Sequence, residues 1–343
     1  MRHTTQEKEE YIVPLDEIEI INYAKRFFTR ATGGHKVALG IGDDCASLRP
    51  AAGHEVLVST DTLAEAVHFL RDLSAPEDIG AKSVHTAVSD IAAMGGRPLA
   101  LLLSINLHEA DRGWIGAYLR GAGKAAREVG APIVGGNVSA AAALSFTVTA
   151  LGEVKKGFRV DRSGARPGDA VYITGHPGES ALGLDLLTER KSKYTPSQKR
   201  LIHRHILPTP RLEWGRMLAE RQIPSAMIDV SDGVTLDFRR MIQASGAGGR
   251  IWLDKIPISE DARKVIGKNS RESVLQKMVT GGEDYELLFT VRPAREARLE
   301  RLIKTGKIEA TRIGDITGEK GKLEIFGKEG KKVDFKVEGW LHS

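Results

Sequence analysis

Residues 76–98 read PEDIGAKSVHTAVSDIAAMGGRP. The apolar positions that recur at helical spacing in this stretch are Ile79, Val84, Val88 and Ile91. Pro76 suits the first turn of a helix, and the Gly-Gly-Arg-Pro run at 95–98 ends one. The sequence therefore predicts a helix over 76–94.

Short apolar runs of the kind that form strands lie on both sides of this helix. Two of them precede it and end in polar segments that contain Asp. The predicted strands cover 37–41, 55–60, 99–107, 132–134 and 143–154, and the predicted helices cover 16–30, 76–94 and 111–129. This order predicts an α/β layer with the helices on one face of the sheet.

A second unit follows a basic, loop-like stretch near 155–168. Its predicted strands are 170–174, 226–230, 249–253 and 285–291, its helices include 180–187, 210–221 and 294–304, and its terminal hairpin is 322–326 with 331–337. We expect a flexible tail over 1–15, an α/β domain over 16–155 and a second α/β domain over 156–343. A chain of 343 residues is long enough for two such cores.

Composition excludes several classes of protein. Hydrophobic residues make up 41% and charged residues 28%, which is typical of globular proteins. The net charge of +5 is too small to indicate a nucleic-acid surface by itself, and the single Cys45 excludes an internal disulfide and a Cys-rich zinc site. The polar first ten residues do not resemble a signal peptide, and no apolar run approaches the roughly 20 residues of a membrane helix. We therefore expect a cytoplasmic protein without nucleic-acid or membrane partners.

The residues most able to carry chemistry are aspartates flanked by Gly, Ser or Thr. They are Asp43, Asp44, Asp61, Asp90, Asp229 and Asp232. Magnesium prefers oxygen ligands and usually binds through a few carboxylates together with substrate phosphates. Carboxylates around one cleft would repel a nucleotide unless cations lay between them, and phosphoryl transfer needs such cations. The pattern therefore indicates magnesium-assisted phosphoryl transfer.

Each motif also has a purely structural interpretation. Asp43-Asp44 can form a turn, and Asp61 or the segment 229–233 can cap a helix. Gly135-Gly136-Asn137 and the segment 281–284 can be ordinary backbone turns, although such turns can also approach a phosphate closely. Arg162 suits a phosphate clamp but equally an exposed linker.

Other nucleotide and hydrolase signatures are missing. The sequence has no P-loop, no Gly-x-Gly-x-x-Gly after a strand, no His-Glu-x-x-His and no Gly-x-Ser-x-Gly. The His203-Arg204-His205 cluster is expected on a solvated helix surface. P-loop, Rossmann, zinc and serine-hydrolase chemistry therefore have no support.

Six short blocks, in order along the chain, together resemble the thiamine-monophosphate kinase family. They are GIGDDCA at 40–46, STDTL at 59–63 with His68-Phe69, SDIAAMG at 89–95, RSGA at 162–165, IDVSDG at 228–233 and GGEDYE at 281–286. This family belongs to the aminoimidazole ribonucleotide synthetase superfamily, whose members bind ATP without a P-loop. The resemblance implies its two-domain fold of mixed α/β sheets, with the N-terminal sheet pairing across a homodimer. It also implies that ATP and thiamine monophosphate give ADP and thiamine diphosphate.

The resemblance implies the site residues as well. The implied magnesium ligands are Asp44, Ser59, Thr60, Asp61, Asp90, Asn137, Asp229 and Asp232. The implied ATP contacts are Gly136, Asn137, Arg162 and Ser231, and the implied contacts to thiamine monophosphate are His68, Glu283 and Trp340. Several Mg²⁺ ions would support direct in-line transfer without a protein base.

Two positions depart from the family pattern. Asn137 stands where the family usually has Asp, so we expect weaker occupancy of one magnesium site. The ending around Trp340 follows the family only loosely. The alternatives are another ATP-binding member of the superfamily, such as a hydrogenase-maturation protein, and a nucleotide- or metal-binding protein without turnover.

Overall fold

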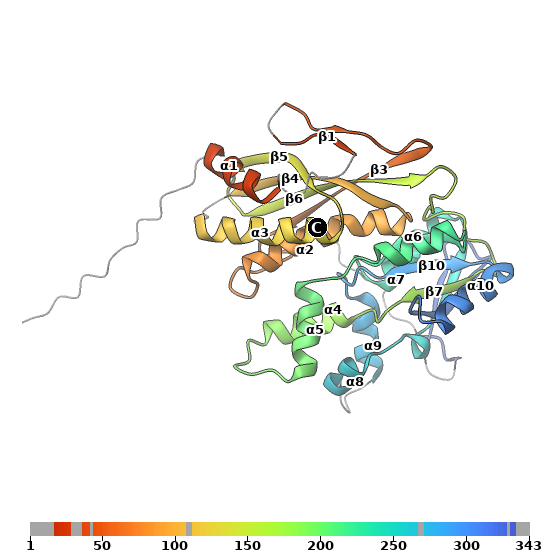
Figure 1. Ribbon diagram of the computed structural model, residues 1–343. Coiled ribbons are helices and arrows are strands. Elements are labelled where there is room, and N and C mark those ends of the chain that lie inside the picture. Colours follow the sequence, from red (N-terminus) through yellow and green to blue (C-terminus); the bar gives the residue numbers. More distant parts are fainter. Residues whose placement is uncertain are drawn as a thin grey trace, which may run out of the picture.

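A computed structural model describes residues 17–28, 36–41, 44–107, 112–266, 271–327 and 330–333. Two sheets organise the chain (Figure 1). The first has the strand order β3-β6-β4-β5 and consists of β3 (His54–Ala64), β4 (Arg97–Leu107), β5 (Ile133–Ala140) and β6 (Ser145–Lys155). Its neighbours are antiparallel except the parallel pair β4 and β5. A small separate pair is formed by β1 (Val37–Leu39) and β2 (Ser47–Leu48).

Helices α2 (Pro76–Ala93) and α3 (Arg112–Glu128) cover one face of the four-stranded sheet, as the sequence predicts (Figure 1). Along β3 the side chains alternate, so that Leu57 and Leu63 are buried beneath α2 while Val58 on the opposite face is 66% exposed. Helix α1 (Glu17–Phe28) packs against α3 and β5.

The second sheet has the order β12-β9-β11-β7-β10-β8. Its strands are β7 (Ala170–Thr174), β8 (Pro224–Asp229), β9 (Gly248–Trp252), β10 (Leu287–Val291), β11 (Ala310–Thr317) and β12 (Leu323–Phe326). The helices are α4 (Glu179–Thr188), α5 (Pro196–Ile206), α6 (Leu212–Glu220), α7 (Val234–Ala244), α8 (Glu260–Ile266), α9 (Arg271–Thr280) and α10 (Pro293–Lys304), with a 3-10 turn at Leu253–Lys255. One hydrophobic core contains side chains of α4, α5, α7 and α9, and another lies toward α6 and α10.

The C-terminal end of α2 joins the two halves of the molecule. Ala92 and Ala93 of α2 are buried in the same core as Leu218 and Ala219 of α6. A Cβ on Gly215 of α6 would lie 2.1 Å from the carbonyl oxygen of Ala92, so only glycine permits this close approach. Helix α2 is therefore fixed to both sheets.

The structure differs from the sequence prediction at several elements. Strand β11 and helices α5, α8 and α9 were not predicted, because their charged and polar side chains obscure the apolar periodicity. One signal for α5 was available, since Thr195, just before the helix, and Gln198, in its first turn, form a capping box. The prediction of a turn at Gly135-Gly136-Asn137 is wrong, because these residues continue β5. A Cβ on Gly136 would lie 1.8 Å from the carbonyl oxygen of Leu103, so glycine lets β5 pair closely with β4.

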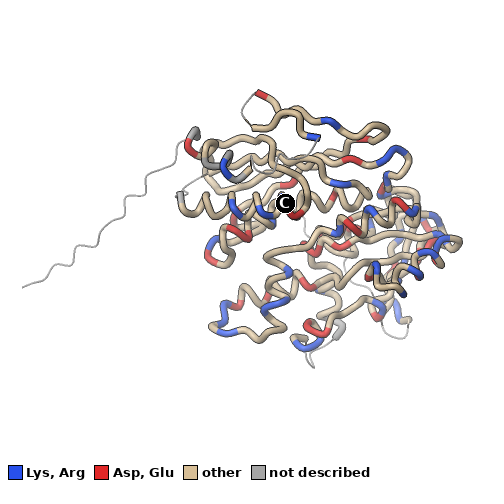
Figure 2. The backbone as a smooth tube through the Cα atoms, viewed as in Figure 1, with Lys and Arg blue, Asp and Glu red and all other residues tan. Residues whose placement is uncertain are grey.

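The distribution of charged residues and the hydropathy of the helices are those expected from the composition. Basic and acidic residues are interspersed over the chain (Figure 2). In the described ranges, no helix is both long and apolar enough to cross a bilayer.

Candidate active site between the two domains

Four aspartates from both halves of the chain form an acidic cluster beside the junction. Asp61 lies within β3, Asp90 on α2, Asp229 at the end of β8 and Asp232 in the turn before α7. Asp61 was expected at a strand end, but β3 continues to Ala64. The strand, the helix and the strand-to-helix turn thus direct their carboxylates toward one another.

Burial and electrostatic repulsion within the cluster raise the pKa values of two of its carboxyl groups. Burial, with the negative charges of Asp90 and Asp232, raises the pKa of Asp61 to about 6. Burial and the neighbouring Asp90 also raise the pKa of Asp229 well above its ordinary value, against the hydrogen bond from Ser89. Without a bound cation, ionisation of Asp61 and Asp229 is therefore less favourable than ionisation of an exposed carboxyl group.

Hydrogen bonds orient the carboxylates of this cluster. The Ser89 hydroxyl donates to Oδ2 of Asp229 across the domain junction at 2.7 Å, and the Ser59 hydroxyl donates to Oδ2 of Asp90. Arg240 pairs with Asp232. Ser59 therefore orients Asp90 in this structure while its oxygen retains a lone pair for a cation.

The donor set fits magnesium. Carboxylate and hydroxyl oxygens are ligands that Mg²⁺ accepts, and it commonly uses one or two protein carboxylates together with water and substrate phosphates. Within the described ranges, no three acidic, His or Cys side chains are arranged to hold one ion among themselves. Oxygen donors of this kind suit ions that share their coordination with the phosphates of a bound ligand.

A cavity of about 700 Å³ opens beside the cluster. Its lining includes Thr60, Asp61, His68, Ser231, Asp232 and Glu283. The main chain of Ser231 is fixed here, because its carbonyl oxygen accepts the N–H of Glu283 at 2.7 Å. The cavity therefore brings together predicted residues of the metal, ATP and substrate groups.

The end of the cavity at Glu283 contains a buried charged network. Lys82 of α2 approaches Oε1 of Glu283 to 2.7 Å, and His205 of α5 lies 3.4 Å from Oε2. Burial alone would raise the pKa of Glu283, but the positive charge of Lys82 lowers it. Burial and Lys82 lower the pKa of His205 to about 4, so this ring is neutral at neutral pH.

The prediction that the His203–His205 cluster lies on a solvated surface is therefore wrong for His205. This side chain is 6% exposed, and its Nδ1 lies 3.0 Å from the Ser180 hydroxyl. Its partners come from α4 and from the segment before β10, which lie elsewhere in the sequence, so periodicity within α5 could not reveal them. The sequence offered one signal of this burial. His205 follows Leu201 by four residues, which places both on the same, apolar side of α5.

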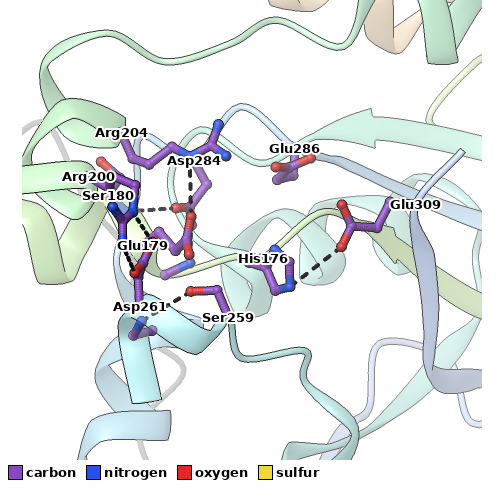
Figure 3. Close-up of polar contacts among 12 residues, drawn as sticks. His176, Glu179, Ser180, Arg200, Arg204, Ser259, Asp261, Asp284, Glu286 and Glu309 are labelled. Atoms are coloured by element: carbon purple, nitrogen blue, oxygen red, sulfur yellow. Dashed lines mark hydrogen bonds and ion pairs between the residues drawn. The ribbon is translucent and has the colours of Figure 1, made fainter. Parts of the chain in front are cut away.

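The backbone around Glu283 is unusual. Glu283 and Tyr285 have φ values of +66° and +53°, a region that residues with side chains seldom adopt. Between them, Asp284 accepts the N–H groups of Gly178 at 2.6 Å and Ser180 at 3.1 Å at the start of α4 (Figure 3). Burial raises the pKa of Asp284 well above its ordinary value. Two further pairs lie near Asp284, namely Arg204 with Glu179 and His176 with Glu309 (Figure 3).

Asp44, Gly136 and Asn137 lie apart from the acidic cluster. They line a second cavity of about 780 Å³ at the outer face of the four-stranded sheet. The two cavities meet at β3 and β6, where the hydroxyl oxygens of Thr60 and Thr149 are 3.1 Å apart. The structure thus distributes the predicted nucleotide and metal residues over two adjoining hollows.

Two other predicted contacts lie away from both cavities or cannot be placed. Arg162 is exposed in the connection between β6 and β7 and lines neither cavity. Trp340 lies outside the described residues.

Comparisons with known proteins agree with this architecture. The family models "AIR synthase related protein, N-terminal domain" and "AIR synthase related protein, C-terminal domain" match residues 42–154 and 166–326. The thiamine-monophosphate kinase of Salmonella typhimurium is 36% identical over 92% of this chain and 96% of its own length. That of Bacillus subtilis is 35% identical over 92% and 95%.

Solved structures give the same result. The crystal structure of thiamine-monophosphate kinase from Stenotrophomonas maltophilia matches with a TM-score of 0.80 at 31% identity, over 90% of this chain and 97% of that one. A structure of AaThiL complexed with AMPPCP and TMP matches with a TM-score of 0.74 at 32% identity, over 97% and 100%. The hydrogenase maturation protein HypE, in complex with ATP, shares the fold at 21% identity and a TM-score of 0.73, over 92% and 93%.

Proposed function

Since the chain belongs to the AIR synthase related proteins and, among them, to the thiamine-monophosphate kinase family, we propose that it transfers the γ-phosphoryl group of ATP to thiamine monophosphate. The products are ADP and thiamine diphosphate. The observation that carries this proposal is the cavity in which Asp61 and Asp232 lie beside His68 and Glu283. Cation-binding oxygens and residues for an organic ligand thereby share one space.

The acidic residues of the chain would bind the cations that compensate the charge of the phosphate groups. Asp61, Asp90, Asp229 and Asp232 would hold magnesium, which, when bound, neutralises the charge on the phosphoryl group in flight. A phosphate oxygen of thiamine monophosphate attacks the γ-phosphorus in line, and the bond from that phosphorus to the departing ADP oxygen breaks. The second pKa of a phosphate monoester is about 6, so the attacking oxygen is already ionised and needs no protein base.

Substrate recognition falls to His68 and Glu283 in the lining of the same cavity. Nδ1 of His68 accepts the Ala64 N–H at 3.1 Å, which leaves Nε2 as the protonated nitrogen of a neutral ring. The hydrogen bond from Ala64 thereby fixes the orientation of the His68 ring in the cavity wall. Glu283 contributes a carboxylate whose charge is set by its neighbours.

A panel of vitamins tests the proposed reaction. Incubation with ATP, Mg²⁺ and phosphorylated or free vitamins, followed by chromatography of the products, should give thiamine diphosphate from thiamine monophosphate and no product from free thiamine. Transfer to a different acceptor contradicts the substrate assignment. Binding of ATP without ADP release in the presence of thiamine monophosphate favours a protein without turnover.

The proposal includes a cytoplasmic homodimer. The outer face of the four-stranded sheet supports it, because Val56 and Val58 are 49% and 66% exposed there, beside the second cavity. Apolar side chains so exposed on a sheet face are typical of a protein interface. In this assembly the partner sheet would cover β3 and the nucleotide residues near Asn137.

The amide of Asn137 predicts weak occupancy of one magnesium site. Asn137 can ligate through its carbonyl oxygen but brings no charge, and the nearby Ser139 hydroxyl donates to Asn106 at 2.7 Å. We expect Asn137→Asp to lower the Mg²⁺ concentration needed for half-maximal turnover by roughly 10-fold, as one added charge at a shared cation site would do. A magnesium titration of turnover for both proteins measures this, and equal midpoints contradict it.

A further inference from the structure

We propose that Lys82 is a positioning residue for the thiamine monophosphate end of the cavity, an inference that rests on the proposed function. Its ammonium group lies 2.7 Å from Oε1 of Glu283 and donates to the carbonyl oxygen of His68 at 3.1 Å. Glu283 belongs to the C-terminal half of the chain and His68 to the N-terminal half. One side chain thus connects two cavity-lining segments that come from different domains.

The burial of Lys82 explains why this contact is specific. Its side chain is only 4% exposed, and a buried lysine requires partners for its charge and its three N–H groups. Glu283 supplies the opposite charge and His68 a neutral acceptor. Removing the lysine would take away the positive charge beside Oε1 of Glu283, an atom that is itself buried, and an uncompensated charge at a buried atom is strongly unfavourable.

Two features of the segments that contain Glu283 and His68 support the positioning role of Lys82. Glu283 has a φ of +66°, a backbone conformation that persists only when its surroundings fix it. The carbonyl oxygen of His68 is held by Lys82 while its ring is held by the Ala64 N–H. Lys82 therefore controls the placement of the two side chains without needing to contact the ligand.

Helix α2 sets a fixed distance between the two ends of the site. Lys82, Thr86 and Asp90 recur every four residues, so they lie along one side of α2. A rise of about 1.5 Å per residue places Lys82 and Asp90 roughly 12 Å apart along the helix axis. The substrate-positioning contact and the acidic cluster are thereby parts of one rigid element.

The decisive experiment separates the affinities for the two ligands. Calorimetry measures the dissociation constants of thiamine monophosphate and, separately, of the ATP analogue AMPPCP with Mg²⁺. Lys82→Met is expected to weaken binding of thiamine monophosphate about 30-fold or more, because truncating one partner of a buried charge pair carries a cost of at least that size. Binding of AMPPCP should stay within about 2-fold, because Lys82 lies roughly 12 Å from Asp90 along the axis of α2.

A double-variant cycle shows whether Lys82 acts through Glu283. In a Glu283→Gln background, Lys82→Met should cost much less affinity for thiamine monophosphate than in the wild type, because the charge it compensates is already removed. The double variant is also free of an unpaired, partly buried carboxylate, so it provides a folded test if Lys82→Met alone does not fold. Arg211→Met is the matched control, since it breaks a buried ion pair with Glu286 away from the main cavity.

Each outcome has a separate meaning. Equal weakening of both ligands by Lys82→Met, as a general structural defect would give, overturns the inference, as does unchanged binding of thiamine monophosphate. A full effect that persists in the Glu283→Gln background assigns Lys82 a direct ligand contact and also overturns the positioning role. A wild-type protein that binds no thiamine monophosphate overturns the proposed function and this inference with it.

Discussion

Replacing Asp61 with Asn should lower kcat about 10²- to 10³-fold, the range seen when one group that stabilises transition-state charge is removed. The amide has the same shape as the carboxylate but no charge, so a cation shared with the phosphates would be held less tightly. Asp61 is central to this effect, because it lies on the cavity wall and interacts with both Asp90 and Asp232. Steady-state turnover at saturating ATP and Mg²⁺ measures the loss.

The same substitution should stabilise the metal-free protein. The pKa of Asp61 is about 6 in the folded state against 3.8 ordinarily, so the folded protein binds the extra proton between these values. The contribution of Asp61 to stability is therefore present below about pH 4, falls as the pH rises through 6 and is fully lost above it. The substituted amide carries no charge at any pH, so Asp61→Asn should raise the free energy of unfolding by about 1 to 3 kcal/mol at pH 7.5 and by little at pH 4.

Thermal unfolding in EDTA at both pH values tests the stability effect. Added Mg²⁺ should stabilise the wild type more than the variant at pH 7.5, since the ion binds only the native cluster. Asp254→Asn is the matched control, because this aspartate is exposed outside both cavities. A variant that keeps its turnover, or that is destabilised at pH 7.5 in EDTA, would show that Asp61 does not belong to a cation-binding cluster.

Replacing Gly215 with Ala should destabilise the protein by about 3 kcal/mol and remove most of its activity, because overpacking at a backbone contact forces a helix to move. The added Cβ would lie 2.1 Å from the carbonyl oxygen of Ala92, where no flexible side chain can yield. Helix α2 carries Ser89 and Asp90, and the Ser89 hydroxyl bonds Asp229 across the junction. Separating α6 from α2 would therefore disturb the alignment of the carboxylates.

Chemical denaturation and turnover measure these two losses. Gly318→Ala is the matched control, because the nearest atom to its added Cβ is 4.0 Å away. The control should unfold and react like the wild type. A Gly215→Ala protein with unchanged stability and turnover would mean that the close contact between α2 and α6 does not set the geometry of the site.

The fold was predictable wherever periodicity was strong. The helix over 76–94 and the strands around it follow from apolar spacing, and the helix covers the sheet as expected. Strand β11 was not predictable in this way, because Arg312 and Asp315 interrupt its apolar pattern while pairing with each other.

The site residues likewise fall into those that the local sequence reveals and those that it does not. Asp61, Asp90, Asp229 and Asp232 are recognisable because Gly, Ser and Thr surround them, and the structure brings them together. Lys82 and His205 are not recognisable, since each finds its charged partner in a distant segment of the chain. Charged residues are buried by contacts that only the tertiary fold creates.

The alternation of side chains along β3 has one further consequence. Ser59 and Asp61 point toward α2, whereas Val58 and Thr60 point to the opposite face, so two neighbouring surfaces depend on the same backbone. In the proposed dimer, a shift in the docking of one subunit on the other would be transmitted along this strand to the acidic groups. A variant altered only at Val58 could then fail as a kinase with its entire reaction machinery unchanged, and dilution alone would reproduce the defect in the native chain.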